Sequence, residues 1–145
     1  MVKAIDVAQY FVSRTNEDEG DLATNLQIQK LLYYAQGLSL AVYDQPIFNE
    51  EIQAWLHGPV VPEVYQEFKK YGSGPIPPLE RLDASIFTTE QLDIMDEVWN
   101  CYGQFSAWRL AEMTHQERPW KETPINGVIS HKLLREYFLT QLVDA

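Results

Sequence analysis

Residues 113–120, MTHQERPW, place a histidine, a carboxylate and a tryptophan within six positions of one another. An imidazole can act as a general base or a metal ligand, and a nearby carboxylate can hold it in one orientation. His115 and Glu117 are two residues apart, so they point to different sides of a helix and share a side only in an extended segment. The stretch is therefore open to three interpretations: a catalytic site, a metal site or a structural corner.

A second stretch, WLHGP at residues 55–59, also places a histidine, His57, close to a tryptophan and a proline. A buried Trp N–H needs one acceptor, and a His beside a helix end can bond free backbone groups through either ring nitrogen. Thr114 or His115 could bond the last helical carbonyls, with Glu117 on the other nitrogen of His115. We interpret both stretches as structural corners. The alternative is a recognition surface, because Trp, Tyr and Arg are frequent in binding hot spots.

Other catalytic or metal-binding patterns are missing from the sequence. Cys101 is the one cysteine, and neither Cys-x-x-Cys nor His-Glu-x-x-His occurs. Cys101 follows Trp99 on a helix that we predict to be buried, which is typical of an inert thiol. Ser106 is better explained as a helix cap than as a nucleophile. We therefore expect no cofactor, no metal, no catalytic residue and no enzymatic activity. A hydrolase using His115 with Glu117 or His57 stays open as an alternative.

The elements that would position these corners are almost all helical, because apolar residues recur at helical spacing. The helix from Thr24 is apolar on most of its sides, which predicts a position at the centre of the fold. Residues 51–56 alternate instead and could form a small two-stranded element. The prediction is an all-α fold: a compact single domain, residues 1–145, of about six helices around a central apolar helix. The six predicted helices begin near residues 4, 24, 62, 88, 106 and 130.

The sequence also predicts where helices begin and end and how one loop packs. Thr24 with Gln27, and Thr88 with Gln91, have capping-box spacing, while Ser130 is predicted to cap the last helix. Pro119 should stop the helix that contains Trp108 and Met113. The loop at 75–87 is predicted to pack onto the core through four apolar side chains: Ile76, Leu79, Leu82 and Ile86.

The charge balance is acidic, with a net charge of -10 and a pI near 4.6. Phosphate backbones need a basic patch, so direct nucleic-acid binding is disfavoured and a basic protein partner fits better. Between Leu31 and Phe68, and again between Leu82 and Trp108, there is no Lys or Arg. The acidic segments 44–67 and 80–97 are either solvated helix faces or a docking face. The candidate partner-binding residues are Glu50, Glu51, Glu63, Glu67, Asp93, Asp96 and Glu97.

The location follows from the lack of targeting signals. The first residues, MVKAIDVAQYFVSR, are too short and too charged for a signal peptide. No apolar run approaches the ~20 residues that a membrane span needs. A single cysteine suits a reducing compartment. We expect a cytoplasmic protein without a membrane association.

Taken together, three motifs make the chain similar to a known family. It resembles the Panacea domain, also described as the SocA-like or GepA phage-associated family, in order and spacing over about residues 5–125. The matching pieces are LQIQKLLYYAQ at 26–36, AWLHGPV at 54–60 followed by Pro62 and Val64-Tyr65, and LAEMTH at 110–115 with Pro119-Trp120.

The resemblance implies a mostly helical fold and an antitoxin that neutralises a toxin by direct protein contact. The toxin gene would be a neighbour, often on a prophage or another mobile element. At least one member is thought to be an adaptor that delivers its toxin to a ClpXP-type protease, which is the alternative function. The family is not known as an enzyme. The residues on its motifs, structural or binding, are Trp55, His57, Gly58, Pro59, Trp108, His115, Glu117, Pro119 and Trp120.

Overall fold

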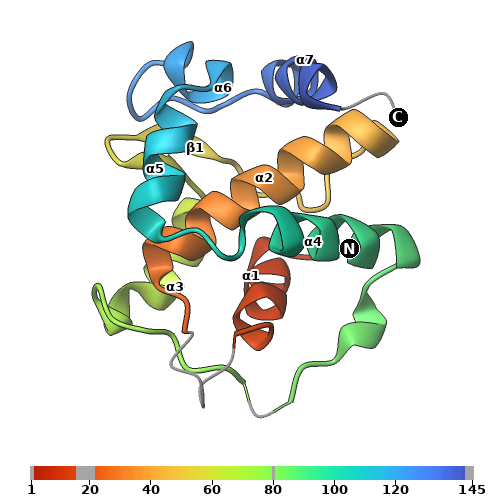
Figure 1. Cartoon of the computed structure of the whole chain (residues 1–145), viewed down its shortest axis with the longest axis vertical. Coiled ribbons are helices and arrows are strands. Elements are labelled where there is room, and N and C mark those ends of the chain that lie inside the picture. The colour runs from red at the N-terminus through yellow and green to blue at the C-terminus, as the bar shows by residue number, and fades with distance from the viewer. Residues whose placement is uncertain (1, 16–21, 80, 143–145) are drawn as a thin grey trace.

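A computed structural model describes residues 2–15, 22–79 and 81–142 of the chain. The central helix lies in the middle of the molecule, and the other elements pack around it (Figure 1). The predicted helical fold with a central helix is confirmed. The described elements are α1 (Ala4–Ser13), α2 (Asn25–Tyr43), β1 (Gln53–Trp55), β2 (Gly58–Val60), α3 (Pro62–Phe68), the 3-10 turns η1 (Lys69–Tyr71) and η2 (Ala84–Ile86), α4 (Thr89–Tyr102), α5 (Ala107–His115), α6 (Arg118–Lys121) and α7 (His131–Gln141).

The central helix α2 is buried along almost its whole length, although it contains polar residues. The Thr24 hydroxyl accepts the Gln27 backbone N–H at 3.3 Å and caps its start. The predicted capping box is only half formed, because the Gln27 side chain donates instead to the carbonyls of Gly103 and Phe105. That contact joins the start of α2 to the turn between α4 and α5. The helix ends at Asp44, which adopts a left-handed conformation with φ of 56°.

Three other predicted caps are confirmed. Thr88 and Gln91 form both bonds of a capping box at the start of α4. Ser106 accepts the Arg109 N–H, and Ser130 caps α7 in the same way. Helix α6 is additional to the prediction. The chain turns at Glu117 and starts a new helix in which proline occupies the first turn, where no N–H donor is needed.

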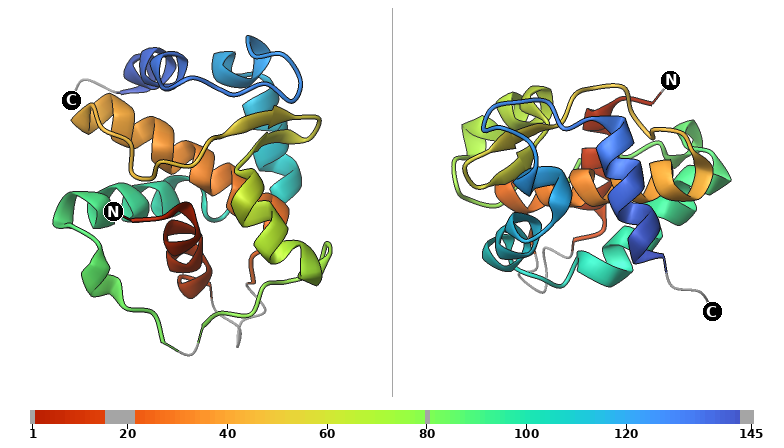
Figure 2. Two further views of the ribbon diagram at one scale, coloured as in Figure 1. Left: turned by 180° about the vertical axis from the view of Figure 1, so that it is seen from behind. Right: turned by 90° about the horizontal axis from the view of Figure 1, so that it is seen from above.

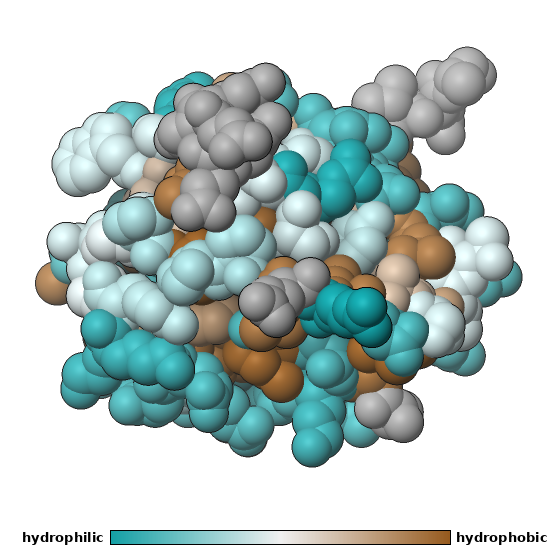
Figure 3. Space-filling model, turned by 90° about the horizontal axis from the view of Figure 1, so that it is seen from below, coloured by the Kyte–Doolittle hydropathy of each residue, from teal (hydrophilic) through white to brown (hydrophobic). Residues whose placement is uncertain are grey.

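The loop before α4 packs onto the core less fully than predicted. Ile76 is buried and its N–H donates to the Ala23 carbonyl at 2.8 Å. Leu82 is partly buried against the core, whereas Leu79 and Ile86 are exposed, so the prediction is wrong for these two. Figure 3 views the side along which this loop runs, and brown apolar atoms there lie between teal polar rims.

The extended piece forms the hairpin β1–β2, which is antiparallel with Trp55 opposite Gly58 and Ala54 opposite Pro59. A segment far along the chain covers the other edge of β1. The Asn126 N–H donates to the Ala54 carbonyl, the Ala54 N–H to the Gly127 carbonyl, and the Ile129 N–H to the Ile52 carbonyl. The hairpin is therefore fastened to the segment that leads into α7. The two views of Figure 2 show α7 crossing over α2 beyond this segment.

Candidate functional site

The two corners predicted separately meet in space and are bonded to each other. The Trp120 indole N–H donates to the carbonyl of Trp55 at 2.7 Å. The His115 ring Nε2 lies 3.0 Å from the carbonyl of Leu56, so this nitrogen carries the proton. The His115 and Trp120 rings also contact each other, with centroids 4.3 Å apart. We call these four residues the hairpin junction, because they bond the end of α5 and helix α6 to the turn of the hairpin.

Gly58 lets the hairpin approach α2 and α5 closely. Its φ of +115° is a conformation that other residues rarely adopt. A Cβ at this position would lie 2.8 Å from Lys30 Cε and 2.8 Å from Thr114 Oγ1. The Thr114 hydroxyl donates to the carbonyl of Ala111 at 2.9 Å, as expected for a residue near the end of α5. Glycine is required here by both backbone and space.

Lys30 is a site residue that the sequence reasoning missed. Its side chain is fully buried, and its ammonium donates to the Pro59 carbonyl at 3.0 Å. No carboxylate among the described residues forms an ion pair with it. Burial lowers the pKa of Lys30 to about 7. The available signal was a lysine inside the apolar stripe of a central helix, where a charged side chain needs a specific acceptor.

Glu117 binds two tyrosines of α2 and not His115. Its Oε1 accepts the Tyr33 hydroxyl at 2.9 Å, and its Oε2 accepts the Tyr34 hydroxyl at 2.8 Å. Burial raises the pKa of Glu117 to about 7, although the two tyrosine bonds act in the opposite direction. Tyr34 in turn stacks on Tyr102 of α4, with ring centroids 3.9 Å apart. The predicted contact between Glu117 and the second His115 nitrogen is replaced by this carboxylate–tyrosine cluster.

His115 and Glu117 nevertheless border the same open surface pocket, with a volume of about 440 Å³. A histidine and a carboxyl group that titrates near neutrality could move protons there. Among the described residues, no serine or cysteine lines this pocket. The lining residues are Arg109, Glu112, Met113, His115, Gln116, Glu117 and Tyr137.

The remaining motif residues divide into buried and exposed groups. Pro59 and Pro119 are buried, in keeping with a role in the corners. His57 is exposed at the hairpin turn, away from the bonds of the hairpin junction. Trp108 is 75% exposed on the first turn of α5. The structure therefore brings His115, Glu117 and Trp120 together with the hairpin, but leaves His57 and Trp108 on the surface.

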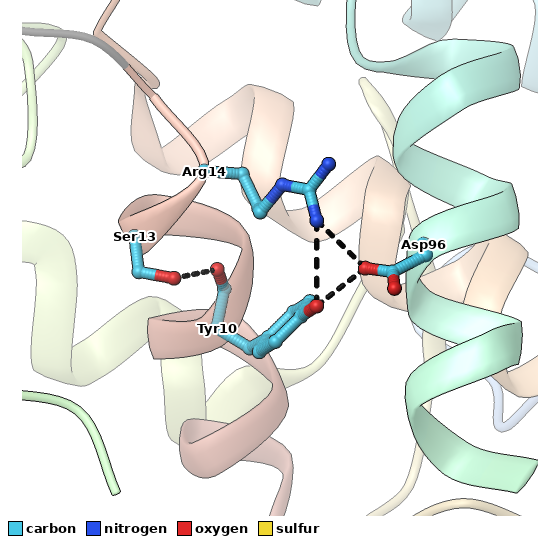
Figure 4. Close-up of polar contacts among 4 residues, drawn as sticks. All are labelled: Tyr10, Ser13, Arg14 and Asp96. Carbon is cyan, nitrogen blue, oxygen red and sulfur yellow. Dashed lines mark hydrogen bonds and ion pairs between the residues drawn. The ribbon is translucent and has the colours of Figure 1, made fainter. Parts of the chain in front are cut away.

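Two of the seven acidic candidates bond another element of the fold. The Glu50 carboxylate accepts the Ala4 N–H at 2.8 Å and holds the start of α1. Asp96 accepts both Arg14, at 2.8 Å, and the Tyr10 hydroxyl, which joins α4 to α1 (Figure 4). Both carboxylates thus have structural partners, which the charge map alone did not reveal.

The other five acidic candidates are exposed but do not form one patch. Glu63 and Glu67 lie on α3, and Asp93 and Glu97 lie on α4. Figure 1 places these helices on either side of α1, and Figure 2 shows the same arrangement from behind. Glu51 precedes the hairpin. Glu80, at the start of the second acidic segment, lies outside the described residues.

Cys101 is exposed, so its predicted burial is wrong. It lies four residues after Glu97, on the same side of α4, and its thiol donates to the Glu97 carboxylate at 3.3 Å. Partial burial and the adjacent carboxylate raise the pKa of this thiol. Both residues line a cleft of about 370 Å³ between α4 and α7. The i, i+4 relation to Glu97 was the signal that placed Cys101 towards solvent.

The described residues include no group of three or more His, Cys, Asp or Glu side chains that could hold a metal ion. Over the same ranges, no helix has the length and apolar character needed to cross a membrane.

Comparisons with known proteins bear on the same elements. The family model described as "Antitoxin SocA-like, Panacea domain" matches residues 28–121, which run from α2 to α6 and include Lys30, the hairpin and the hairpin junction. Antitoxin SocA of Caulobacter vibrioides (strain NA1000 / CB15N) is 45% identical over 49 residues. These cover 34% of this chain and only 26% of that relative. No solved structure matches.

Proposed function

Because this chain belongs to the SocA-like antitoxin family of the Panacea domain, we propose that it neutralises a cognate toxin by binding it directly. The toxin would come from a neighbouring gene, on a prophage or another mobile element. The whole chain, residues 1–145, would act as one binding domain in the cytoplasm.

The observation that carries this proposal is that the motif side chains form hydrogen bonds with other parts of the fold. The His115 imidazole bonds the Leu56 carbonyl, and Trp120 bonds the Trp55 carbonyl. Both oxygens of Glu117 accept tyrosine hydroxyls. Side chains committed to such contacts stabilise a scaffold, and this supports a protein that works through its surface.

The charge of the chain supports a basic partner. The net charge is -10, and five of the seven acidic candidates are exposed. Complementary charge accelerates association and excludes partners of the wrong sign. Exposed carboxylates interact through solvent and are screened by salt. We therefore expect the complex to weaken as the salt concentration rises.

The test is growth of cells that express the adjacent gene, with and without this protein. An antitoxin acting by contact should remove the toxicity and co-purify with the toxin. Toxicity that persists in the presence of this protein, or rescue without any complex and without loss of the toxin, would contradict the proposal.

A matched variant separates binding from catalysis by His115. His115→Gln keeps an N–H donor for the Leu56 carbonyl but removes the imidazole. A binding protein should retain full rescue, whereas a histidine-dependent hydrolase should lose it.

A protease adaptor is the second candidate, because the exposed carboxylates of α3 and α4 form two separate surfaces on either side of α1. An adaptor needs one surface for its cargo and another for the protease. Its signature would be a toxin half-life shortened by this protein in cells with a ClpXP-type protease and unchanged in cells without it.

A further inference from the structure

The central helix is not covered on all sides. Helices α4 and α7 both pack on α2 but leave a cleft between them, and Figure 1 shows α2 running between these two helices. Tyr34 and Leu38 of α2 line this cleft, and Leu38 is only half-buried. The central helix of the fold thus remains partly open along one side.

The side chains around this cleft are mostly apolar or aromatic. Six of the nine lining residues are of this kind, and Leu142 on the α7 wall is 39% exposed. Tyr34, Val98 and Phe138 are buried, so Leu38, Tyr102 and Leu142 are the ones that offer apolar surface to a partner. The nine lining residues are Tyr34, Leu38, Glu97, Val98, Cys101, Tyr102, Phe138, Gln141 and Leu142.

The shape of the cleft favours a helix as its occupant. Two helices form the walls and a third forms the floor, so an added helix would complete the layer over α2. An amphipathic helix that lays its apolar face into a groove is a recurring mode of recognition.

The charge beside the cleft favours a docked helix of a particular charge. Glu90, Asp93 and Glu97 lie three and four residues apart on α4, so they form one exposed stripe along it. No Lys or Arg occurs from residue 82 to residue 108, and none of the ion pairs among the described residues involves this stripe. A helix with Lys or Arg on the edge that faces α4 would complement this charge.

We infer that the α4–α7 cleft is the site at which an amphipathic helix of the toxin docks, apolar against the floor of the cleft and basic against α4. This inference rests on the proposed antitoxin function and names the surface that performs it. The α7 wall starts at His131, beyond the family match, which ends at residue 121. One wall of the cleft thus lies outside the matched family region, where a surface specific to one toxin can be built.

A second copy of this chain fits the cleft less well. Each copy carries a net charge of -10, and docking one copy on another would bring like charges together along α4. The open pocket beside His115 is also a weaker candidate, because Arg109 and Glu112 give it both signs of charge.

The test compares two charge reversals of equal size. D93K/E97K reverses two exposed carboxylates beside the cleft, and E63K/E67K reverses two exposed carboxylates on α3 with the same i, i+4 spacing. With the product of the adjacent gene as the probe, D93K/E97K should weaken binding by at least about tenfold and abolish rescue of growth. E63K/E67K should bind within about twofold of the unaltered chain. Circular dichroism of both variants controls for folding.

Cys101 supplies an independent readout, because it is the one cysteine of the chain and lines the cleft. Complex formation should slow its reaction with a maleimide by at least about tenfold, since a docked helix covers the thiol. Prior attachment of a bulky maleimide should block binding, while Cys101→Ser treated in the same way should still bind.

The outcomes separate this inference from the function on which it rests. Failure of the unaltered chain to bind the toxin or rescue growth overturns both. Rescue and binding that survive D93K/E97K, or a thiol that reacts equally fast in the complex, overturn the cleft assignment and leave the antitoxin function standing. A dimer of this chain that protects Cys101 without any toxin also overturns it.

Discussion

The two sides of α2 differ in the kind of contact that their side chains make. On one side, the hairpin, α5 and α6 are joined by hydrogen bonds from Lys30, His115 and Trp120 to backbone carbonyls. On the other side, α4 and α7 leave an apolar cleft in which Leu38 and Leu142 remain accessible. The bonded side holds the hairpin, α5 and α6 together. The open side leaves apolar area available for a partner.

Two glycines show the same contrast. Gly58 on the bonded side contacts Lys30 and Thr114, while Gly37 on the other side contacts the Phe138 ring of α7, which a Cβ would overlap. Each glycine allows a close approach to α2. The approach at Gly58 brings the hairpin against Lys30 and Thr114. The approach at Gly37 brings α7, one wall of the cleft, against α2.

The largest effect should come from Gly58→Ala. The substitution forces alanine into a φ of +115° and crowds Lys30 and Thr114, so we expect a loss of about 3 kcal/mol or more. The measurement is the free energy of unfolding in urea. Gly72→Ala is the matched control, because Gly72 also has a positive φ but has nothing near its Cβ position. An equal loss in both variants would show that the junction is not crowded.

Lys30→Met tests the buried cation. The folded-state pKa of Lys30 is about 7, below its ordinary value of 10.5, so the unfolded chain binds a proton that the folded chain lacks between these values. Stability should therefore rise as pH rises from 7 to 9, on the order of 2 kcal/mol. The variant should lose this rise in urea titrations at each pH. A rise of the same size in Lys30→Met would assign it to other groups.

Glu117→Gln tests a dependence of stability on pH that has the opposite sign. The folded-state pKa of Glu117 is about 7, above its ordinary value of 4.5, so the folded chain holds the extra proton between these values. Stability should therefore fall as pH rises from 4.5 to 7, by about 1–3 kcal/mol. The variant should show a flatter profile over this window. A profile that stays unchanged in Glu117→Gln would remove the carboxylate–tyrosine cluster as its cause.

Leu142→Ser should have the smallest effect on stability, within about 0.5 kcal/mol, because this side chain is exposed at the end of α7. It should still weaken toxin binding, because it removes apolar surface from the cleft wall. The pair of measurements sharpens the comparison: substitutions on the bonded side alter unfolding, and this one alters binding. A stability loss as large as that of Gly58→Ala would contradict it.

The parts of the fold that could be predicted have local causes. The apolar stripe of α2 and the caps at Thr88, Ser106 and Ser130 depend on residues within one or two turns of each other. The hairpin was visible as alternation at 51–56. Helix α6 was missed because Pro119 can end one helix or occupy the first turn of another, and the sequence pattern allows both.

The site was harder to predict because its contacts join distant parts of the chain. Glu117 and its two tyrosines are 83 and 84 residues apart, and no periodicity links them. Both corners were found, but their contact with each other was not, since each was explained by its own helix end. The acidic residues were assigned to a docking face from their charge alone. In the structure, Glu50 and Asp96 bond residues at the two ends of α1.

The hairpin junction also determines how late in its synthesis the chain can complete its fold. The Leu56 carbonyl is bonded by a residue 59 positions later, and the Trp55 carbonyl by one 65 positions later. At ~5–20 residues per second, a ribosome needs roughly 3–13 s to cover that interval. Throughout it the hairpin has its bond to Lys30 but none to α5 or α6, and β1 still lacks its partners at residues 126–129. A nascent chain therefore completes its scaffold in one late step, and a prematurely terminated one never does.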